Sequence, residues 1–354
     1  MTHLADILDT AALEAQIAAG LITRRVLVGS DIAVYNYTAR AAFSGTWSTE
    51  TRRCRGLVAD GAGRVLARPF EKFFDISMSE IPDGECLVTE KVDGSLGILY
   101  QGPDGLAITT RGDPNGWQSR AATALFNERY GGYIPPAGVT LLFEIVLPEN
   151  RVVIDYGDRR DLVALAAIDI DSGRDVDLPD NWSGPTVERF DASSGSFDEL
   201  VRQAEQEQDR EGFVLHWPET GLRAKVKLAD YLRRHRLIFA TSTKTIWEAL
   251  AAGRDPVAEV AGGPGELVRF VETHVTALSE RHDSAVTSAR DVVAGLTPAQ
   301  RAERRAAAGA IKASREPGLA FLALDGRDAE LERAAWRVVR PERSEAFRTE
   351  GAGE

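Results

Sequence analysis

The chain has 354 residues, of which 44% are hydrophobic, and it carries a formal net charge of −12. This composition predicts a globular protein with a buried core, and the negative charge argues against a protein that coats nucleic acid non-specifically. No run approaches the roughly 18–20 apolar residues of a membrane helix, and the N-terminus lacks the features of a secretory signal. Cys54 and Cys86 match neither a disulfide framework nor a metal-site spacing. We therefore expect a soluble, cytoplasmic protein.

The first two thirds of the chain predict a mixed domain. Apolar residues recur at helical spacing from Leu4 to about Gly20, which predicts an N-terminal helix. From about residue 26 to 227, short β-type runs alternate with Gly, Pro, Asp and Asn, and residues 118–130 form a predicted helix between strands. Strict β-α-β alternation is missing, so the pattern predicts an α+β fold of antiparallel sheets with flanking helices.

The last third predicts helices only. The helical segments that we expect are 246–252, 264–283, 285–294, 298–313 and 328–338. We therefore divide the chain into an α+β domain over residues 1–240, an all-helical domain over 241–340 and a disordered tail over 341–354.

The run Thr89-Glu90-Lys91-Val92-Asp93-Gly94-Ser95 places a lysine at the end of a predicted strand, just before a turn that contains glycine. An extended backbone would project Lys91 and Asp93 to the same side. A lysine becomes a nucleophile when burial or neighbouring cations lower its pKa from about 10.4. The alternative for this run is a β-turn with a surface lysine.

A basic strand is predicted at residues 222–228. Strand periodicity places Arg223, Lys225 and Lys227 on one face and the intervening apolar residues on the other. Three neighbouring cations repel one another, so an anion between them would explain the pattern. The alternative is a solvated strand face.

Two carboxylates stand in apolar runs. Glu144 interrupts the hydrophobic stretch 141–147, and Glu211 precedes Gly212-Phe213-Val214-Leu215. An ionised carboxylate in such a place requires a counter-charge or a metal ion. Carboxylate oxygens suit Mg²⁺, which commonly bridges to a phosphate. The alternative for each glutamate is a structural salt bridge with nearby cations.

Taken in order, these segments resemble the motifs of the covalent nucleotidyltransferase superfamily, and more closely those of the RNA ligase 1 family of T-even phages. The segments that match motifs I, Ia, III, IIIa, IV and V are Lys91–Ser95, Thr110–Gly112, Phe143-Glu144, Arg151–Tyr156, Glu211–Val214 and Lys225–Lys227. Tyr35–Tyr37 with Cys54–Gly56, the segment Lys72–Phe74, and Tyr231 with His235 are similar to further signatures of that family. Arg111 departs from the lysine expected in motif Ia, which preserves the charge but changes the hydrogen-bond geometry.

The resemblance implies a role for each of these residues. Lys91 would become adenylylated, with Asp93 acting locally and Lys225 and Lys227 binding the α-phosphate of ATP. The other implied ATP contacts are Arg55 and Lys72 at the β- and γ-phosphates, Glu144 at the ribose, Phe213 and Val214 against adenine, and Glu90 and Arg111. Glu211 would position Mg²⁺, with Mn²⁺ as an alternative.

The resemblance also implies an activity, that of an ATP-dependent RNA ligase. Such an enzyme joins 5′-phosphate and 3′-hydroxyl RNA ends through a lysyl–AMP intermediate and an RNA-adenylate. Nicked tRNA is the substrate that the family suggests, with a monomeric enzyme whose helical domain engages RNA. Three alternatives stay open: a GTP-dependent capping-type nucleotidyltransferase, a DNA ligase and a non-catalytic relative that binds RNA or nucleotide. DNA ligases and capping enzymes normally carry an OB-fold after motif V, whereas helices are predicted here.

Overall fold

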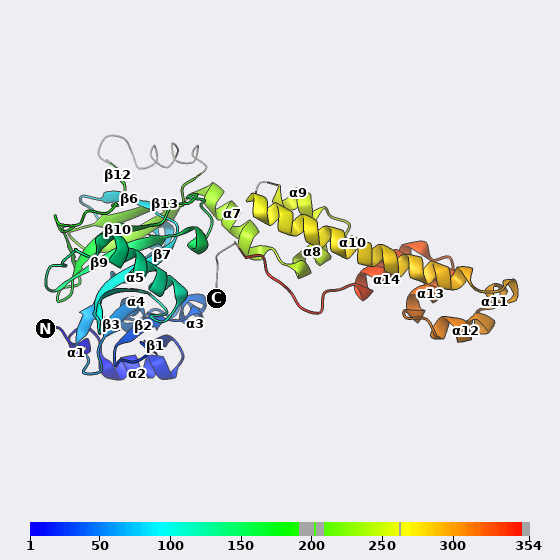
Figure 1. The fold of residues 1–354 in the computed structure, drawn as a ribbon, viewed down its shortest axis with the longest axis horizontal. Helices are drawn as coiled ribbons and strands as arrows, with labels where there is room; N and C mark the ends of the chain where they lie inside the picture. Colours follow the sequence, from blue (N-terminus) through cyan, green and yellow to red (C-terminus); the bar gives the residue numbers. More distant parts are fainter. Residues whose placement is uncertain (191–201, 203–208, 262, 349–354) are drawn as a thin grey trace. The chain divides into compact units, whose positions relative to one another are not determined.

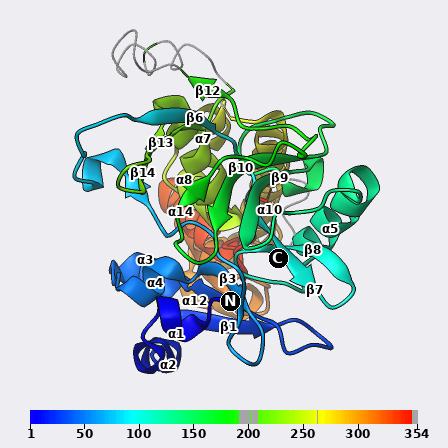
Figure 2. The same cartoon turned by 90° about the vertical axis from the view of Figure 1, so that its left-hand side faces the viewer.

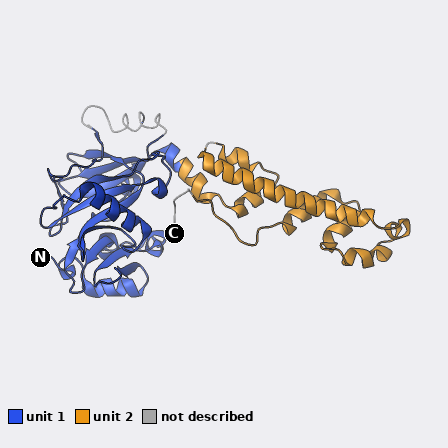
Figure 3. Ribbon diagram, in the orientation of Figure 1, with its two compact units in different colours: residues 1–232, 350–354 blue, residues 233–349 orange. Residues whose placement is uncertain are grey.

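The computed structural model describes residues 1–190, 202, 209–261 and 263–348. The chain divides into two compact units, the first formed by Met1–Leu232 and the second beginning at Arg233 (Figure 3). The division falls inside helix α7 (Ala229–Ala240), a little before the expected domain boundary at residue 240. The expected α+β fold with antiparallel sheets and a helical C-terminal region is confirmed. Within the described residues, no helix has both the length and the apolar character needed to cross a bilayer.

Three sheets organise the described part of unit 1 (Figure 1). The four-stranded sheet has the order β1 (Ile22–Val26), β2 (Ala33–Tyr37), β3 (Arg55–Ala59) and β4 (Val65–Ala67). The second sheet has the order β11 (Asp175–Val176), β10 (Asp161–Asp169), β9 (Val139–Val146), β7 (Ser95–Gly102) and β8 (Gly105–Thr110). The third has the order β12 (Arg189–Phe190), β6 (Leu87–Lys91), β13 (Gly212–Trp217), β14 (Leu222–Lys227) and β5 (Phe74–Asp75). Among these described pairs only β14 and β5 run parallel.

The N-terminal helix was expected to be continuous, and this prediction is wrong. The structure has α1 (Leu4–Ile7) and α2 (Thr10–Ala18), separated at Asp9. The Asp9 side chain accepts hydrogen bonds from the backbone N–H groups of Ala11 and Ala12, so it starts a new helix. Two short helices, α3 (Ala39–Ser44) and α4 (Thr49–Arg53), were not predicted.

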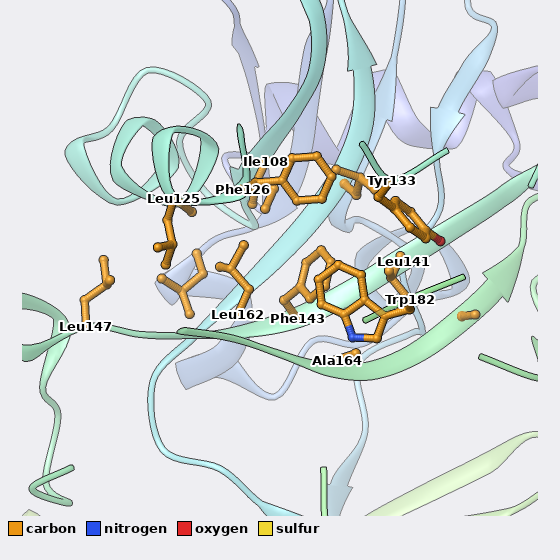
Figure 4. Packing of buried hydrophobic residues seen from close by; sticks show 14 residues of the cluster. Ile108, Leu125, Phe126, Tyr133, Leu141, Phe143, Leu147, Leu162, Ala164 and Trp182 are labelled. Carbon is orange, nitrogen blue, oxygen red and sulfur yellow. The ribbon is translucent and has the colours of Figure 1, made fainter. Parts of the chain in front are cut away.

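Helix α5 (Trp117–Tyr130) covers part of the second sheet, as Figure 2 shows beside β8, and the predicted helix over 118–130 is confirmed. Its Ala122, Leu125 and Phe126 are buried at the spacing of one helix face. Figure 4 shows this core, where Phe126 and Trp182 gather around Phe143. The ring centroids of Phe143 and Trp182 lie 5.0 Å apart. This packing fixes β9, the strand that carries Glu144.

The regular secondary structure of unit 2 is helical within its described residues. After α7 come α8 (Thr243–Ala251), α9 (Pro256–Val260), α10 (Gly265–Ala294), α11 (Pro298–Ala302), α12 (Arg304–Lys312), α13 (Pro317–Leu324) and α14 (Asp328–Val338). The prediction of α14 is confirmed in both bounds, whereas α13 was not predicted. The predicted helices 264–283 and 285–294 are one continuous helix of 30 residues, because buried residues keep helical spacing through Leu278, His282 and Val286. The predicted helix 298–313 is divided at Glu303, whose backbone is extended.

The segment after α14 was expected to be disordered, and for residues 341–348 this prediction is wrong. Phe347 is buried against Phe270, with ring centroids 5.4 Å apart. Its backbone N–H donates to the carbonyl of Thr241, and Thr243 donates to the carbonyl of Glu345. One buried aromatic ring and these backbone bonds hold the segment. Residues 349–354 of the expected tail lie outside the described part of the chain.

Candidate active site

A pocket of about 620 Å³ lies in unit 1 and is lined by strands of both five-stranded sheets. One wall comes from β6, β13 and β14, and the other includes Leu96 of β7, Glu144 of β9 and the middle of β10. Of the residues to which the resemblance assigned an individual role, nine line this pocket: Arg55, Lys72, Glu90, Lys91, Arg111, Glu144, Val214, Lys225 and Lys227.

At one end of the pocket Glu211 lies between Lys91 and Lys227. Gly212 of β13 is in register with Lys91 of β6 on one side and with Lys227 of β14 on the other. Glu211, the residue before Gly212, therefore contacts both lysines. Its Oε2 is 2.8 Å from Lys91 Nζ and its Oε1 is 2.8 Å from Lys227 Nζ. Glu211 is only 3% exposed. The strand register thus builds a lysine–carboxylate–lysine group around the buried Glu211, which lies 120 positions after Lys91 in the sequence.

Gly212 is required for this arrangement. Its φ of 151° lies in a region that side chains rarely adopt, and a Cβ there would stand 1.9 Å from the carbonyl oxygen of Val226. Only glycine allows β13 to begin at this point against β14. The glycine after Glu211 is therefore a structural condition for the ion pairs.

The electrostatics of the group favour charged side chains. Burial lowers the pKa of Lys91, but the carboxylates of Glu211 and Glu144 outweigh it and raise the pKa above its ordinary value. Burial raises the pKa of Glu211, but Lys91 and Lys227 outweigh it and hold that pKa below its ordinary value. Lys91 is therefore an ammonium in the free protein. It becomes a nucleophile only when the influence of the carboxylates is weakened.

Asp93 organises the backbone around Lys91. Its Oδ2 accepts hydrogen bonds from the N–H groups of Val153 and Ile154 at 2.7 and 2.8 Å, and its Oδ1 accepts one from the Tyr231 hydroxyl at 2.9 Å. Its own N–H donates to the Tyr156 hydroxyl at 2.9 Å. Asp93 is 5% exposed, so these contacts fix the turn after Lys91. The local role expected for Asp93 agrees with this geometry.

Glu144 faces the pocket from the opposite sheet. Burial raises its pKa to about 8, Lys91 opposes this shift, and Glu211 and Asp93 reinforce it. At neutral pH Glu144 is therefore protonated in most molecules, and its carboxyl group can donate a hydrogen bond. Gly94 makes room for it, because a Cβ at that position would lie 3.1 Å from Glu144 Cγ and 2.5 Å from the Ile145 carbonyl.

Beside these carboxylates the pocket carries an excess of cations. Arg55 lies over the rings of Phe70 and Phe73, with its Cζ 4.9 and 5.5 Å from their centroids. Its Nε and Nη1 are buried and have no hydrogen-bond partner among the described residues. Burial lowers the pKa of Arg55 to about 10. An anionic ligand would supply the missing acceptors.

Lys72 belongs to the same cationic group. Its Nζ lies 4.7 Å from the centroid of the Phe74 ring. Burial and the charges of Lys225 and Arg55 together lower its pKa to about 8, although the carboxylate of Asp75 opposes this shift. Lys72, Lys225, Arg55 and Arg111 therefore all repel one another within one pocket.

The basic strand is placed as its periodicity predicts. Arg223, Lys225 and Lys227 line the pocket, while Ala224 and Leu228 are buried in the core on the other face. Two carboxylates contact this strand that sequence reasoning missed. Asp175 forms an ion pair with Arg223, and Asp75 lies 3.8 Å from Lys225 Nζ. Parallel pairing of β5 with β14 places Asp75 next to Lys225. A local sequence pattern does not predict such a long-range pairing of strands.

The prediction that Phe213 lines the site is wrong. Phe213 is fully buried in the core behind β13 and packs edge-on against Phe190, with centroids 5.3 Å apart. Side chains alternate along a strand, so Phe213 and Val214 cannot both face the pocket. Val214 is the one that lines it.

The described residues contain no group of three His, Cys, Asp or Glu side chains able to enclose a metal ion. Both Glu211 oxygens are engaged with lysines. The donor set therefore does not fit a metal held by protein ligands alone. It does fit a hydrated Mg²⁺ that binds one carboxylate and takes its other ligands from water and phosphate.

No protein-family model matches the sequence. Among solved structures, an archaeal ATP-dependent RNA ligase is 16% identical, with a TM-score of 0.47 and 86% of each chain covered. A provisionally named ATP-dependent DNA ligase from Aquifex aeolicus is 14% identical, with a TM-score of 0.40 over 76% of this chain and 71% of that one. An RNA ligase of Naegleria gruberi with PPi is 18% identical, with a TM-score of 0.33 over 43% and 51%. At these values, no likeness assigns an activity to this chain.

Proposed function

We propose that the protein is an ATP-dependent RNA ligase that carries AMP on Lys91. The observation that carries this proposal is the lysine–carboxylate–lysine group at the end of a cation-lined pocket. Lys91 Nζ lies 2.8 Å from Glu211, and Arg55, Lys72, Arg111 and Lys225 line the same pocket. A site that only bound nucleotide would have no use for a lysine nucleophile among these charges. The assignment to the RNA ligase 1 type rests on the ordered sequence motifs.

In the first step Lys91 Nζ loses its proton to solvent and attacks the α-phosphorus of ATP. A P–N bond forms, the bond from the α-phosphorus to the bridging oxygen breaks, and pyrophosphate leaves with the electron pair. Lys225 and Lys227 would neutralise the α-phosphate, and Arg55 and Lys72 the β- and γ-phosphates. Such a displacement depends on positioning and on charge neutralisation.

The remaining pocket residues would hold the nucleoside. The protonated Glu144 would donate to a ribose hydroxyl, and Val214 with Glu90 would border the base. Glu211 would hold a hydrated Mg²⁺ or Mn²⁺, whose charge favours the unprotonated form of a neighbouring lysine. That ion would oppose the effect of the carboxylates on Lys91, so we expect adenylylation to require a divalent cation.

In the second step an RNA 5′-phosphate oxygen attacks the lysyl-bound phosphorus and the P–N bond breaks, which gives RNA-adenylate and restores Lys91. In the third step an RNA 3′-hydroxyl attacks the 5′-phosphorus, a phosphodiester forms and AMP leaves. We propose nicked tRNA as the substrate, a monomeric enzyme, a cytoplasmic location and RNA contacts by the helical unit.

The test of the first step is transfer of label from α-labelled ATP to protein, with intact-mass detection of the added AMP. We expect labelling of the wild type, and loss of at least about 10⁴-fold in Lys91→Ala because removal of a nucleophile removes the covalent pathway. Lys244→Ala is the matched control, since Lys244 lies in α8 and pairs with Glu248 at the surface. Label retained by Lys91→Ala would refute the mechanism, and labelling by GTP in place of ATP would indicate a capping-type enzyme.

The substrate is tested by ligation in parallel of 5′-phosphorylated single-stranded RNA, nicked tRNA, nicked duplex RNA and nicked DNA. We expect sealing of RNA, with nicked tRNA preferred. Sealing of DNA alone would contradict the RNA assignment while leaving the lysyl–AMP step intact.

A further inference from the structure

A second cavity of about 290 Å³ adjoins the first in unit 1. The two share Phe70, Lys72, Phe73 and Arg223. The other walls include the end of α4, the segment 68–71, the turn at 172–174 and the turn between β13 and β14. None of the roles proposed above uses these walls.

The lining of the second cavity is strongly cationic. Six cationic side chains line it: Arg52, Arg53, Arg68, Lys72, Arg174 and Arg223. One carboxylate, Glu71, lines it as well. Glu71 forms ion pairs with two of the arginines, at 2.9 Å from Arg53 and 3.5 Å from Arg52. Asp175 balances Arg223 from outside the cavity. The cations therefore outnumber the carboxylates that contact them.

Several of these cations are held by neutral acceptors. Arg68 donates from Nη1 to the carbonyls of Ile170 and Asp171 at 2.9 and 2.8 Å. Lys72 donates to the carbonyl of Phe73 at 2.6 Å, and Arg174 donates to that of Glu219 at 3.4 Å. Backbone carbonyls orient a cation without cancelling its charge. The mutual repulsion therefore remains in the free protein.

The backbone at Gly173 lies close against the Arg68 guanidinium in the wall of the cavity. Gly173 has a φ of +71°, and a Cβ there would lie 2.5 Å from the Arg68 guanidinium. Arg68 itself is only 9% exposed. Burial and the charge of Arg53 lower the pKa of Arg68 more than the carboxylates of Glu71, Asp169 and Asp171 raise it. This is a formed cavity with a buried cation in its wall, which distinguishes it from a solvated patch of surface arginines.

We propose that this cavity is a second anion site and that its ligand is pyrophosphate or a similar small phosphate anion. Phosphate oxygens accept several charge-assisted hydrogen bonds at once, and guanidinium groups match their geometry. The choice of pyrophosphate rests on the proposed function, because the first step releases it. Lys72 and Arg223 belong to both cavities, so an anion in the second one lies next to the proposed β- and γ-phosphate contacts. Bound pyrophosphate would therefore influence ATP binding.

The test is the binding of radiolabelled pyrophosphate to the full chain by equilibrium dialysis, with and without saturating α,β-methylene ATP. We expect pyrophosphate to bind while the analogue fills the first pocket. Arg52 and Arg174 line only the second cavity. The double variant R52Q/R174Q should weaken this residual binding more than about tenfold, since it removes two donors of charge-assisted hydrogen bonds. The affinity for the analogue should stay unchanged.

The matched control is R129Q/R159Q, which makes the same charge change at two exposed arginines outside both cavities. Equal weakening by both double variants would show a general effect of net charge and would overturn the proposal. Absence of residual binding to the wild type would also overturn it. Displacement of pyrophosphate by a 5′-phosphorylated RNA that binds more tightly would overturn the small-anion assignment. If the analogue fails to bind, the proposed function fails, while pyrophosphate binding by wild type and R52Q/R174Q still decides this proposal.

Discussion

The interiors of the two units differ in where they keep charge. Unit 1 buries a carboxylate, Glu211, between two lysines and buries Asp93 under three hydrogen bonds. The described ion pairs of unit 2 are mostly exposed, as in the contacts of Arg290 with Asp328 and Glu332. Its buried positions are mainly apolar, such as Leu331 and Ala335.

This difference supports the proposal that the active site lies in unit 1. Removal of a charge from water costs several kcal/mol, so a fold keeps buried charges only where other groups offset that cost. Burial of apolar side chains between helices needs no such compensation, because it stabilises the fold by itself. We therefore assign the reaction to unit 1 and expect unit 2 to respond to mutation through packing.

The first prediction separates packing from chemistry. Leu331 of α14 is fully buried, so Leu331→Ala should lower the free energy of unfolding of unit 2 by about 3 kcal/mol through a cavity and lost apolar contact. Below the melting transition, lysyl–AMP formation should keep its wild-type rate. Denaturant unfolding followed by circular dichroism, together with the labelling assay, checks both statements. Loss of labelling in a folded Leu331→Ala protein would contradict the division of roles.

A second prediction contrasts a buried ion pair with an exposed one. Glu211→Gln leaves Lys91 and Lys227 without their shared carboxylate, and the free energy of unfolding should fall by about 2–3 kcal/mol. This lies below the full cost of a buried unpaired charge because the lysine side chains are 22% and 20% exposed. Arg290→Gln breaks only surface pairs and should cost less than about 1 kcal/mol. Equal losses in chemical denaturation would show that the contrast between the units is wrong.

In unit 1, the sequence predicted most of the charged side chains that line the pocket, but not all of the residues that contact them. Alternation along 222–228 predicted correctly which residues face the pocket and which face the core, because a strand has a fixed period of two. The same rule excludes Phe213, since Val214 faces the pocket. Asp75 and Asp175 were missed because they reach the basic strand only through tertiary structure.

In unit 2, helical periodicity predicted both bounds of α14, but it did not predict where α10 and the helices of 298–313 begin and end. Buried residues keep their spacing through residue 284, so α10 continues there, whereas the backbone turns at Glu303. The burial of Phe347 was also missed, because a single aromatic residue in a polar tail gives no periodic signal.

A third prediction uses the pKa of Lys72, which is about 8 in the folded protein against 10.5 ordinarily. The Lys72 ammonium is lost as the pH rises through 8, so its attraction for phosphate disappears there. We expect the affinity for α,β-methylene ATP to fall up to about tenfold between pH 7 and 9, which corresponds to about 1.4 kcal/mol. Lys72→Arg keeps its charge over this range and should flatten the profile in calorimetric titrations. An equally steep fall in that variant would assign the effect to another group.

The last prediction concerns Glu144 and the dependence of stability on pH. Its folded pKa of about 8 exceeds its ordinary value of 4.5, mainly because of burial. At pH 7 the folded state therefore already holds a mostly neutral side chain, although an unfolded chain would ionise it. Between pH 4.5 and 8 the folded state binds the extra proton, so this group reduces the free energy of unfolding as the pH rises. Glu144→Gln removes that dependence: the variant should be at least as stable as the wild type at pH 7, and its advantage should grow between pH 5 and pH 9. Denaturation of both proteins at pH 5, 7 and 9 tests this.

A Glu144→Gln variant that is less stable than the wild type at every pH would mean that the carboxylate is charged and paired. The buried carboxylates of unit 1 would then differ less from one another than their surroundings indicate.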